Sequence, residues 1–275
     1  MSIERAAGLR ALRAFGATTQ CILLGMLAFA PSWLSAQMPA DHVALGKTAE
    51  EAHDIKTALK HYQAALQQDS ANYEANWRGA MILLTLGEQR GDDNKKNPER
   101  DSLYATAEHY ARRAVVSEPS GADGHFALAA AVGRASLSMG TKAKIRRASV
   151  IRSEAMRALA LNPRHDGAYH ILGRWNAEIM RISGFNRFFA KSFLGGGIFG
   201  KASWEQAIYN MQKAVQLDPG RIYHHLELAE IYGERKRTRD ATAQLRAVDS
   251  LPEREVMDSA YKRQGDELRR RLAKH

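Results

Sequence analysis

The chain has 275 residues, of which 45% are hydrophobic and only 7 are proline, and it carries a formal net charge of +10 at pH 7. A hydrophobic share of this size supports a sizeable core and excludes wholesale disorder. A single cysteine, Cys21, excludes a disulfide framework, and the basic balance favours acidic partners over basic ones.

The N-terminal segment has the order of a secretory signal peptide. Three arginines in the first 13 residues precede the apolar run CILLGMLAFA at 21–30. Pro31 and the small or aliphatic residues at 34–36 follow this run. The apolar run falls well short of the roughly 20 residues that span a bilayer. We therefore expect residues 1–36 to be cleaved and the protein to be exported, either periplasmic or secreted. An uncleaved N-terminal membrane anchor is the alternative.

Cleavage ahead of Gln37 changes what chemistry the mature chain can carry. It removes Cys21, three arginines and one glutamate, so the remaining chain has no thiol and keeps a net charge of +8. A cysteine metal site and a cysteine nucleophile are then both excluded.

Helix-ending turns recur along the rest of the chain. Pro119, Pro163, Pro219 and Pro252 each follow a segment with apolar–polar periodicity, and Ser70 takes the same place earlier. Small residues seven positions apart lie two turns along one helix face in three of these segments: Ala58 and Ala65, Ala107 and Ala114, and Ala207 and Ala214. A proline after the second helix of a roughly 34-residue unit is typical of tetratricopeptide (TPR) repeats. The sequence predicts an all-α, TPR-like helical-repeat solenoid of about five units over residues 37–252.

First helices are expected around 42–52, 74–84, 126–135, 168–173 and 228–232, where small residues follow bulky ones. The spacing between units exceeds 34 residues because inserts fall between the two helices of a unit. The main inserts are a polar loop with no core content at 87–102 and a stretch at 181–202, and a shorter one lies near 138–143. Residues 253–275 place four apolar side chains near one helical face and are predicted to form a C-terminal capping helix.

Four segments carry a resemblance to a known family. They are EANWRGA at 74–80, AYHILGRW at 168–175, FFAKSFLGGGIFGKASWEQAI at 188–208 and QKAVQLDP at 212–219. Over about residues 45–252 the chain resembles the regulator of microtubule dynamics family of TPR-like proteins. The resemblance implies a helical interaction protein, and the animal members are described as associating with microtubules and organelle membranes. A secretory signal would separate this chain from the cytoskeleton, so the microtubule role stays an alternative.

The usual TPR ligand site is a concave groove lined by the first helices, and the resemblance implies the same here. Arg134 and Arg174 could hold a carboxylate through paired N–H donors, although solvated surface charges are the plainer interpretation. We predict a non-enzymatic scaffold that binds a protein or peptide partner. The groove-facing candidates are Arg134, His170, Arg174, Glu178, Tyr223, Leu226 and Glu230.

The insert and the basic runs suggest a second kind of partner. Phenylalanines at i, i+3, i+4 and i+8 would share one face of a helix, namely Phe185, Phe188, Phe189 and Phe193. They indicate either a contact with a membrane or partner, or a cover over the neighbouring repeat. Basic runs at 142–147, 235–237 and 269–271 could meet an anionic membrane surface or could be solvated faces. Because we expect export, no nucleic-acid partner is expected.

No cofactor or metal site is predicted. The stretch GGGIFGK at 195–201 approaches a phosphate-binding loop, but Ala202 follows the lysine where a Ser or Thr is needed. We interpret it as a turn before a helix that Ser203 caps. His224 and His225 are adjacent and diverge by about 100° on a helix, so they cannot easily share one metal ion. No nucleophile–base arrangement is visible either.

Overall fold

The computed structural model describes residues 38–91, 96–182, 200 and 202–274. Residues 37–275 form one compact unit. Within the described ranges the chain forms eleven α-helices and no strand. The predicted signal peptide and the four phenylalanines of the insert lie outside these ranges.

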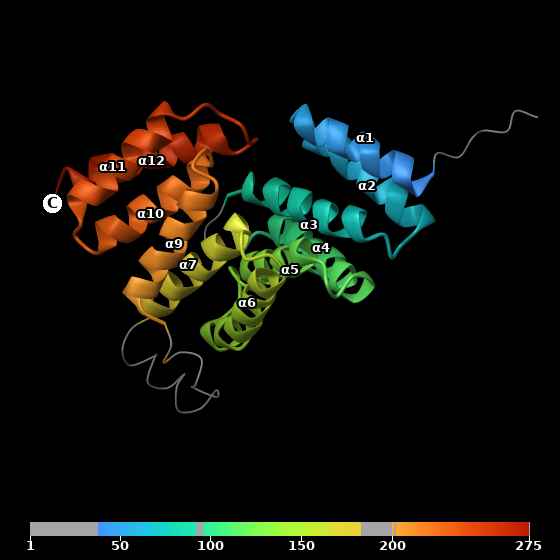
Figure 1. Cartoon of the computed structure of the whole chain (residues 1–275), viewed down its shortest axis with the longest axis horizontal. Coiled ribbons are helices and arrows are strands. Elements are labelled where there is room, and N and C mark those ends of the chain that lie inside the picture. The colour runs from blue at the N-terminus through green and yellow to red at the C-terminus, as the bar shows by residue number, and fades with distance from the viewer. Residues whose placement is uncertain (1–37, 92–95, 183–199, 201, 275) are drawn as a thin grey trace, which may run out of the picture. The chain divides into compact units, whose positions relative to one another are not determined.

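Successive helices pair as antiparallel helix–turn–helix units, shown in chain order from blue to red in Figure 1. This arrangement confirms the predicted all-α, TPR-like helical-repeat fold. The pairs are α1 (Pro39–Glu51) with α2 (Ile55–Gln68), α3 (Tyr73–Glu88) with α4 (Pro98–Ser117), α5 (Ala122–Ala135) with α6 (Thr141–Leu161), α7 (Asp166–Arg181) with α9 (Trp204–Leu217), and α10 (Ile222–Glu234) with α11 (Thr238–Ser250). A last helix, α12 (Asp258–Leu272), packs against α10 and α11.

Small residues recur where the two helices of a unit meet. The eighth residue after the N-cap is glycine or alanine in all five first helices, at positions 46, 80, 129, 173 and 229. A Cβ on Gly46 would lie 2.5 Å from the ring of Tyr62, and one on Gly173 would lie 2.9 Å from the Cε of Met211. The predicted alanine pairs of α2, α4 and α9 are all fully buried, which confirms their packing role.

A side chain clamps the turn before the first helix in three units. Asn76, His125 and His225 each take the fourth position after the N-cap, and all three are buried. Each lies 3.0 Å from the backbone carbonyl oxygen six residues earlier, that of Ser70, Pro119 and Pro219 respectively. The other polar atom reaches the second helix of the same unit, at Arg113, Glu154 and Gln244 respectively. The predicted turn positions are therefore fixed by a repeated hydrogen bond, which the sequence pattern did not reveal.

The prediction of a polar loop at 87–102 is wrong in its bounds, and it is also wrong that this stretch contributes no residue to the core. Gly87 and Glu88 still belong to α3, and α4 begins at Pro98 behind an Asn97 cap that accepts a hydrogen bond from the N–H of Arg100. Arg100 is fully buried and donates to the carbonyl oxygen of Gly91 at 3.0 Å. The charged composition concealed a helix start, because acidic residues and proline are favourable in the first turn of a helix.

Ser203 caps α9 as predicted, since its hydroxyl oxygen accepts a hydrogen bond from the N–H of Gln206 at 3.1 Å. Among the residues that the structure describes, no helix is both long enough and apolar enough to cross a membrane.

Candidate partner-binding face

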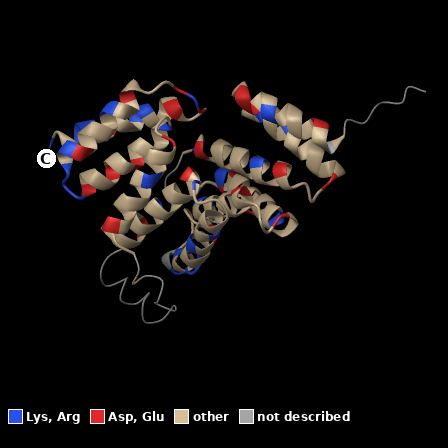
Figure 2. Ribbon diagram, in the orientation of Figure 1, with Lys and Arg blue, Asp and Glu red and all other residues tan. Residues whose placement is uncertain are grey.

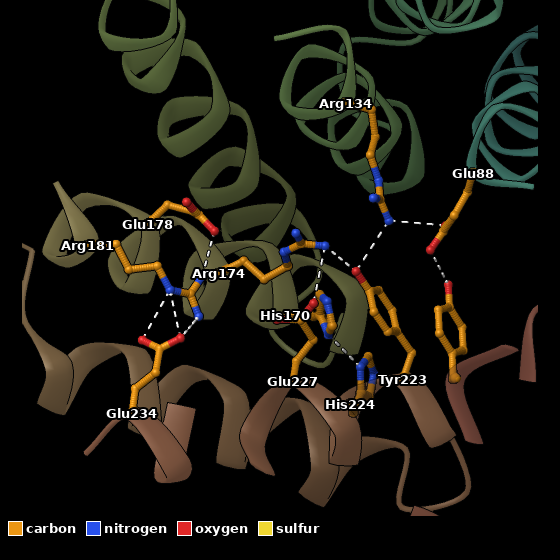
Figure 3. Close-up of polar contacts among 11 residues, drawn as sticks. Glu88, Arg134, His170, Arg174, Glu178, Arg181, Tyr223, His224, Glu227 and Glu234 are labelled. Atoms are coloured by element: carbon orange, nitrogen blue, oxygen red, sulfur yellow. Dashed lines mark hydrogen bonds and ion pairs between the residues drawn. The ribbon is translucent and has the colours of Figure 1, made fainter. Parts of the chain in front are cut away.

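The first helices of the units carry the predicted binding residues, and the structure shows what those residues contact. Arg134 of α5 donates through Nη2 to the hydroxyl oxygen of Tyr223 of α10 at 3.2 Å. Arg174 of α7 donates to the same hydroxyl oxygen and pairs with the Glu227 carboxylate at 3.3 Å. Figure 3 shows both guanidinium groups converging on Tyr223 from different units. We call the side of the repeats that holds these residues the first-helix face.

Glu88, the last residue of α3, extends this network to the second unit. Its Oε2 accepts a hydrogen bond from Arg134 at 3.1 Å, and its Oε1 accepts one from the hydroxyl of Tyr261 in α12 at 2.9 Å. The rings of Tyr223 and Tyr261 stack with centroids 4.4 Å apart and an interplanar angle of 11°. Burial raises the pKa of Tyr261 well above its ordinary value, and the Glu88 carboxylate adds to the rise. Burial likewise raises the pKa of Tyr223, so both tyrosines stay neutral and remain hydrogen-bond donors or acceptors.

Beyond this network, α7 and α10 face each other with charged side chains that remain partly accessible. Arg181 donates to the carboxylate of Glu234 through Nε at 2.9 Å and through Nη2 at 2.6 Å. It also donates through Nη1 to Glu178 at 2.5 Å. The side chain of Arg181 is 28% exposed, that of Glu234 37% and that of Glu178 57%. Burial raises the pKa of Glu230 to about 7, and the nearby Glu227 carboxylate acts in the same direction. This end of the face presents exposed donors and acceptors in a fixed arrangement.

A buried histidine pair lies beneath Tyr223. The Nδ1 atoms of His170 and His224 are 2.9 Å apart, and the Nε2 of His224 lies 2.9 Å from a carboxylate oxygen of Asp166. Burial lowers the pKa of His170 well below its ordinary value, and the neighbouring His224 ring acts in the same direction. Burial also lowers the pKa of His224, although the Asp166 hydrogen bond opposes this shift. His170 is therefore part of the packing between α7 and α10, and its side chain is only 6% exposed.

The sequence pattern described as "Regulator of microtubule dynamics protein 1-3" matches residues 40–273. The chain belongs to this family. The match extends beyond the predicted 45–252 and includes α12.

Two relatives of this family match part of the chain, and a solved structure shares its fold. Regulator of microtubule dynamics protein 1 of Bos taurus is 27% identical over 161 residues, which cover 58% of this chain and 49% of that protein. The Mus musculus protein is 26% identical over 161 residues, covering 58% and 51%. The chain thus spans about half the length of the curated relatives that it matches. A thermophilic TPR protein of Thermus thermophilus superposes with a TM-score of 0.58 at 19% identity, covering 86% of this chain and 97% of that one.

The predicted site residues divide into three groups in this family member. Arg134, Arg174 and Tyr223 join one network, and Glu178 and Glu230 lie at its accessible end. His170 is buried below the network. Leu226 is 2% exposed and packs in a core cluster, so its side chain is not accessible to a partner in this structure.

Four further residues of the network were not predicted: Glu88, Asp166, Glu227 and Tyr261. Glu88 was assigned to a loop, and Tyr261 to a cap that only covers apolar surface. The Tyr223–Tyr261 stack joins residues far apart in sequence, so no local pattern could have revealed it. Asp166 gave a weak signal, because it is the acidic residue in the first turn of α7.

The remaining sequence candidates contribute less to this face. His224 and His225 diverge as predicted: His224 approaches Asp166, and His225 approaches Pro219 and Gln244. Within the described ranges no three His, Cys, Asp or Glu side chains are placed to hold a metal ion.

In the basic runs, Arg147 pairs with Glu108, Arg237 with Asp240, and Arg269 with Asp249. The phosphate-loop-like stretch lies almost entirely outside the described residues.

Proposed function

We propose that this protein is a non-enzymatic scaffold that binds a protein or peptide partner along its first-helix face, and that it does so after export. The observation that carries the proposal is the partly exposed Glu178–Arg181–Glu234 group, whose donors and acceptors are held between two repeats. Stacked helical repeats provide extended surfaces of this kind for protein recognition. A partner would bring polar and charged side chains, because those are what this face can pair with.

Site-specific photo-crosslinking tests the proposed face. A crosslinker replaces Glu178 on α7 in one sample and Val116 on α4, which is 80% exposed, in the other. We expect one protein from the envelope fraction to be crosslinked from position 178 and not from position 116. An Arg181→Gln variant should weaken that crosslink, whereas Arg112→Gln, at an exposed second-helix arginine, should leave it unchanged. Equal crosslinking from both positions would remove the first-helix face as the binding site.

An anionic membrane surface is the second candidate, favoured by α6. This helix carries six basic residues and one acidic residue, and its Lys142, Arg146 and Arg157 are exposed. Figure 2 shows Lys and Arg gathered at one end of α6. Attraction between such a patch and anionic lipid is screened by salt. We expect co-sedimentation with vesicles containing phosphatidylglycerol at low salt and release at about 0.5 M salt; no sedimentation at low salt would exclude this candidate.

A microtubule role rests on the names of the relatives alone. It requires the N-terminus to remain in the cytoplasm, so N-terminal sequencing of the protein from its native source decides between this role and export. A first residue at Gln37 would support export and count against the microtubule role.

A further inference from the structure

A polar bridge joins two parts of the repeat array that are far apart in the chain. In helical-repeat proteins each unit contacts only its neighbours. Here the hydroxyl of Tyr261 in α12 donates to Glu88 at the end of α3, across 173 residues of sequence. Arg134 of the third unit also reaches past the fourth unit to Tyr223 of the fifth. We call Glu88, Arg134, Tyr223 and Tyr261 the clasp.

The clasp closes a route over the first-helix face. Its four side chains come from α3, α5, α10 and α12, and the Tyr223–Tyr261 stack links the two halves of the bridge. Figure 3 shows Arg134 between Glu88 and Tyr223. Glu88 and Arg134 are only 11% and 13% exposed. A partner that runs along the first helices from the second unit to the fifth must therefore displace the clasp.

The segment before α12 is held in place by its own contacts. Asp258 accepts hydrogen bonds from the backbone N–H groups of Arg254 and Glu255, each at 2.7 Å, and Glu255 pairs with Arg221 at 2.9 Å. These bonds fasten the segment to the fifth unit. Its one described apolar contact with the first units is Val256, which packs against the core cluster of α1, α2 and α3.

The two sides of the clasp are folded independently of it. The first units have core clusters of their own, and α12 packs with α10 and α11 around Val248, Leu245 and Leu268. Glu88 also sits at the C-terminal end of α3, where the helix dipole disfavours a carboxylate. The described apolar contact that opening would break is that of Val256, while the core clusters on the two sides stay packed.

We propose that the clasp is a releasable autoinhibitory contact. Closed, it covers the first-helix face between the second and fifth units; open, it frees that face while every helix stays folded. The control of partner binding by this opening rests on the proposed scaffold function. The opening of the clasp does not depend on that function.

The test measures the opening without a partner. Spin labels on Glu51→Cys and Glu253→Cys, both exposed positions, report the distance between the first unit and the segment before α12 in the full chain with Cys21→Ser. Tyr261→Phe loses one hydrogen bond of the clasp and should lower the closed-to-open ratio about tenfold. Glu88→Ala/Tyr261→Phe also loses the bond from Arg134 and should lower the ratio about a hundredfold, so that longer distances appear.

Tyr232→Phe is the matched control. It removes a tyrosine hydroxyl of similar burial, 4% exposed, whose hydrogen bond from Gln212 lies between neighbouring helices. It should leave the distance distribution of the wild type unchanged. An unchanged distribution in the double variant would overturn the proposal, and so would a loss of its helical circular dichroism, because the contact would then hold the fold itself.

Crosslinking from position 178 in the double variant separates the clasp from the scaffold function. If the first-helix face binds the partner, capture should rise about tenfold as the face opens. Longer distances with unchanged capture would keep the clasp and remove its control of binding.

Discussion

Two pairs of histidines join helices through their Nδ1 atoms, and they differ in almost everything else. His42 of α1 and His61 of α2 are 3.2 Å apart and half-buried within the first unit. His170 and His224 are 2.9 Å apart, 6% and 1% exposed, and they connect the fourth unit to the fifth. The same contact is half-buried in one place and a buried junction in the other, because only the second is covered by Tyr223 and supported by Asp166.

Counting protons shows why the buried pair must stay neutral. His224 donates from Nε2 to Asp166 and accepts at Nδ1 from His170, which leaves the Nε2 of His170 as a bare acceptor with no partner in the structure. If either ring takes up one more proton, the Nε2 of His170 carries an N–H. A buried N–H without an acceptor costs free energy. Because the first pair is half-buried, water can satisfy its free nitrogens.

The largest expected effect comes from removing the support of the buried pair. Asp166→Ala leaves the buried N–H of His224 without an acceptor and takes a partner from Arg221, so we expect the free energy of unfolding to fall by about 3 kcal/mol. Urea denaturation measures it. Asp166→Asn keeps an oxygen that can accept from His224 and should lose clearly less; equal losses would mean that the hydrogen bond is unimportant.

Acidification should destabilise the protein through the same pair. The folded pKa values of His170 and His224 lie below the unfolded value of about 6.5, so the unfolded state binds more protons as the pH falls past that value. Stability is fully present above about pH 6.5 and is lost below it, by about 2 kcal/mol at about pH 5 for one proton. The charged groups that face the pair are Asp166, Asp218, Arg134, Arg174 and Arg221.

Urea denaturation between about pH 7.5 and 5 in wild type and His170→Asn checks this prediction. Asparagine can still donate toward His224 but does not titrate, so the variant should show a flatter dependence. His42→Asn makes the same change in the half-buried pair and should keep the wild-type dependence. The idea fails if His42→Asn flattens the curve as much as His170→Asn does. The pKa of Asp166 is lowered, so its own stabilisation is lost only at more acidic pH, below about 4.

His225, next in sequence to His224, should matter for a different reason. His225→Leu removes the bond to the Pro219 carbonyl and the contact with Gln244, and we expect a loss of about 1 kcal/mol in the free energy of unfolding. His225→Asn places an amide where Asn76 has one and should recover part of that loss. If the leucine variant is as stable as the wild type, the repeated clamp does not contribute to stability.

The smallest effect is expected in the half-buried pair. His42→Ala should change the free energy of unfolding by no more than about 0.5 kcal/mol, because water replaces the lost contact. A loss of the size expected for Asp166→Ala would show that burial does not distinguish the two pairs.

Much of the fold could be predicted because TPR packing is local. Ala207 and Ala214 face the paired helix because they are two turns apart, and Ser203 caps α9 because its side chain bonds within its own first turn. Both relations depend on residues close in sequence. The start of α4 was missed because charged residues such as those at 99–101 suit both a loop and a first helical turn.

The sequence by itself determined the helices, their pairing and the small residues between them, since a period of about 3.6 residues and a proline at most of the turns act over one unit. Arg134, Arg174 and Tyr223 could be chosen as first-helix residues for the same reason. Only the tertiary structure decided that they contact one another, that His170 is buried, and that Tyr261 meets Glu88. These contacts depend on the small rotation between one unit and the next, which accumulates over several repeats and is written in no single stretch of the chain.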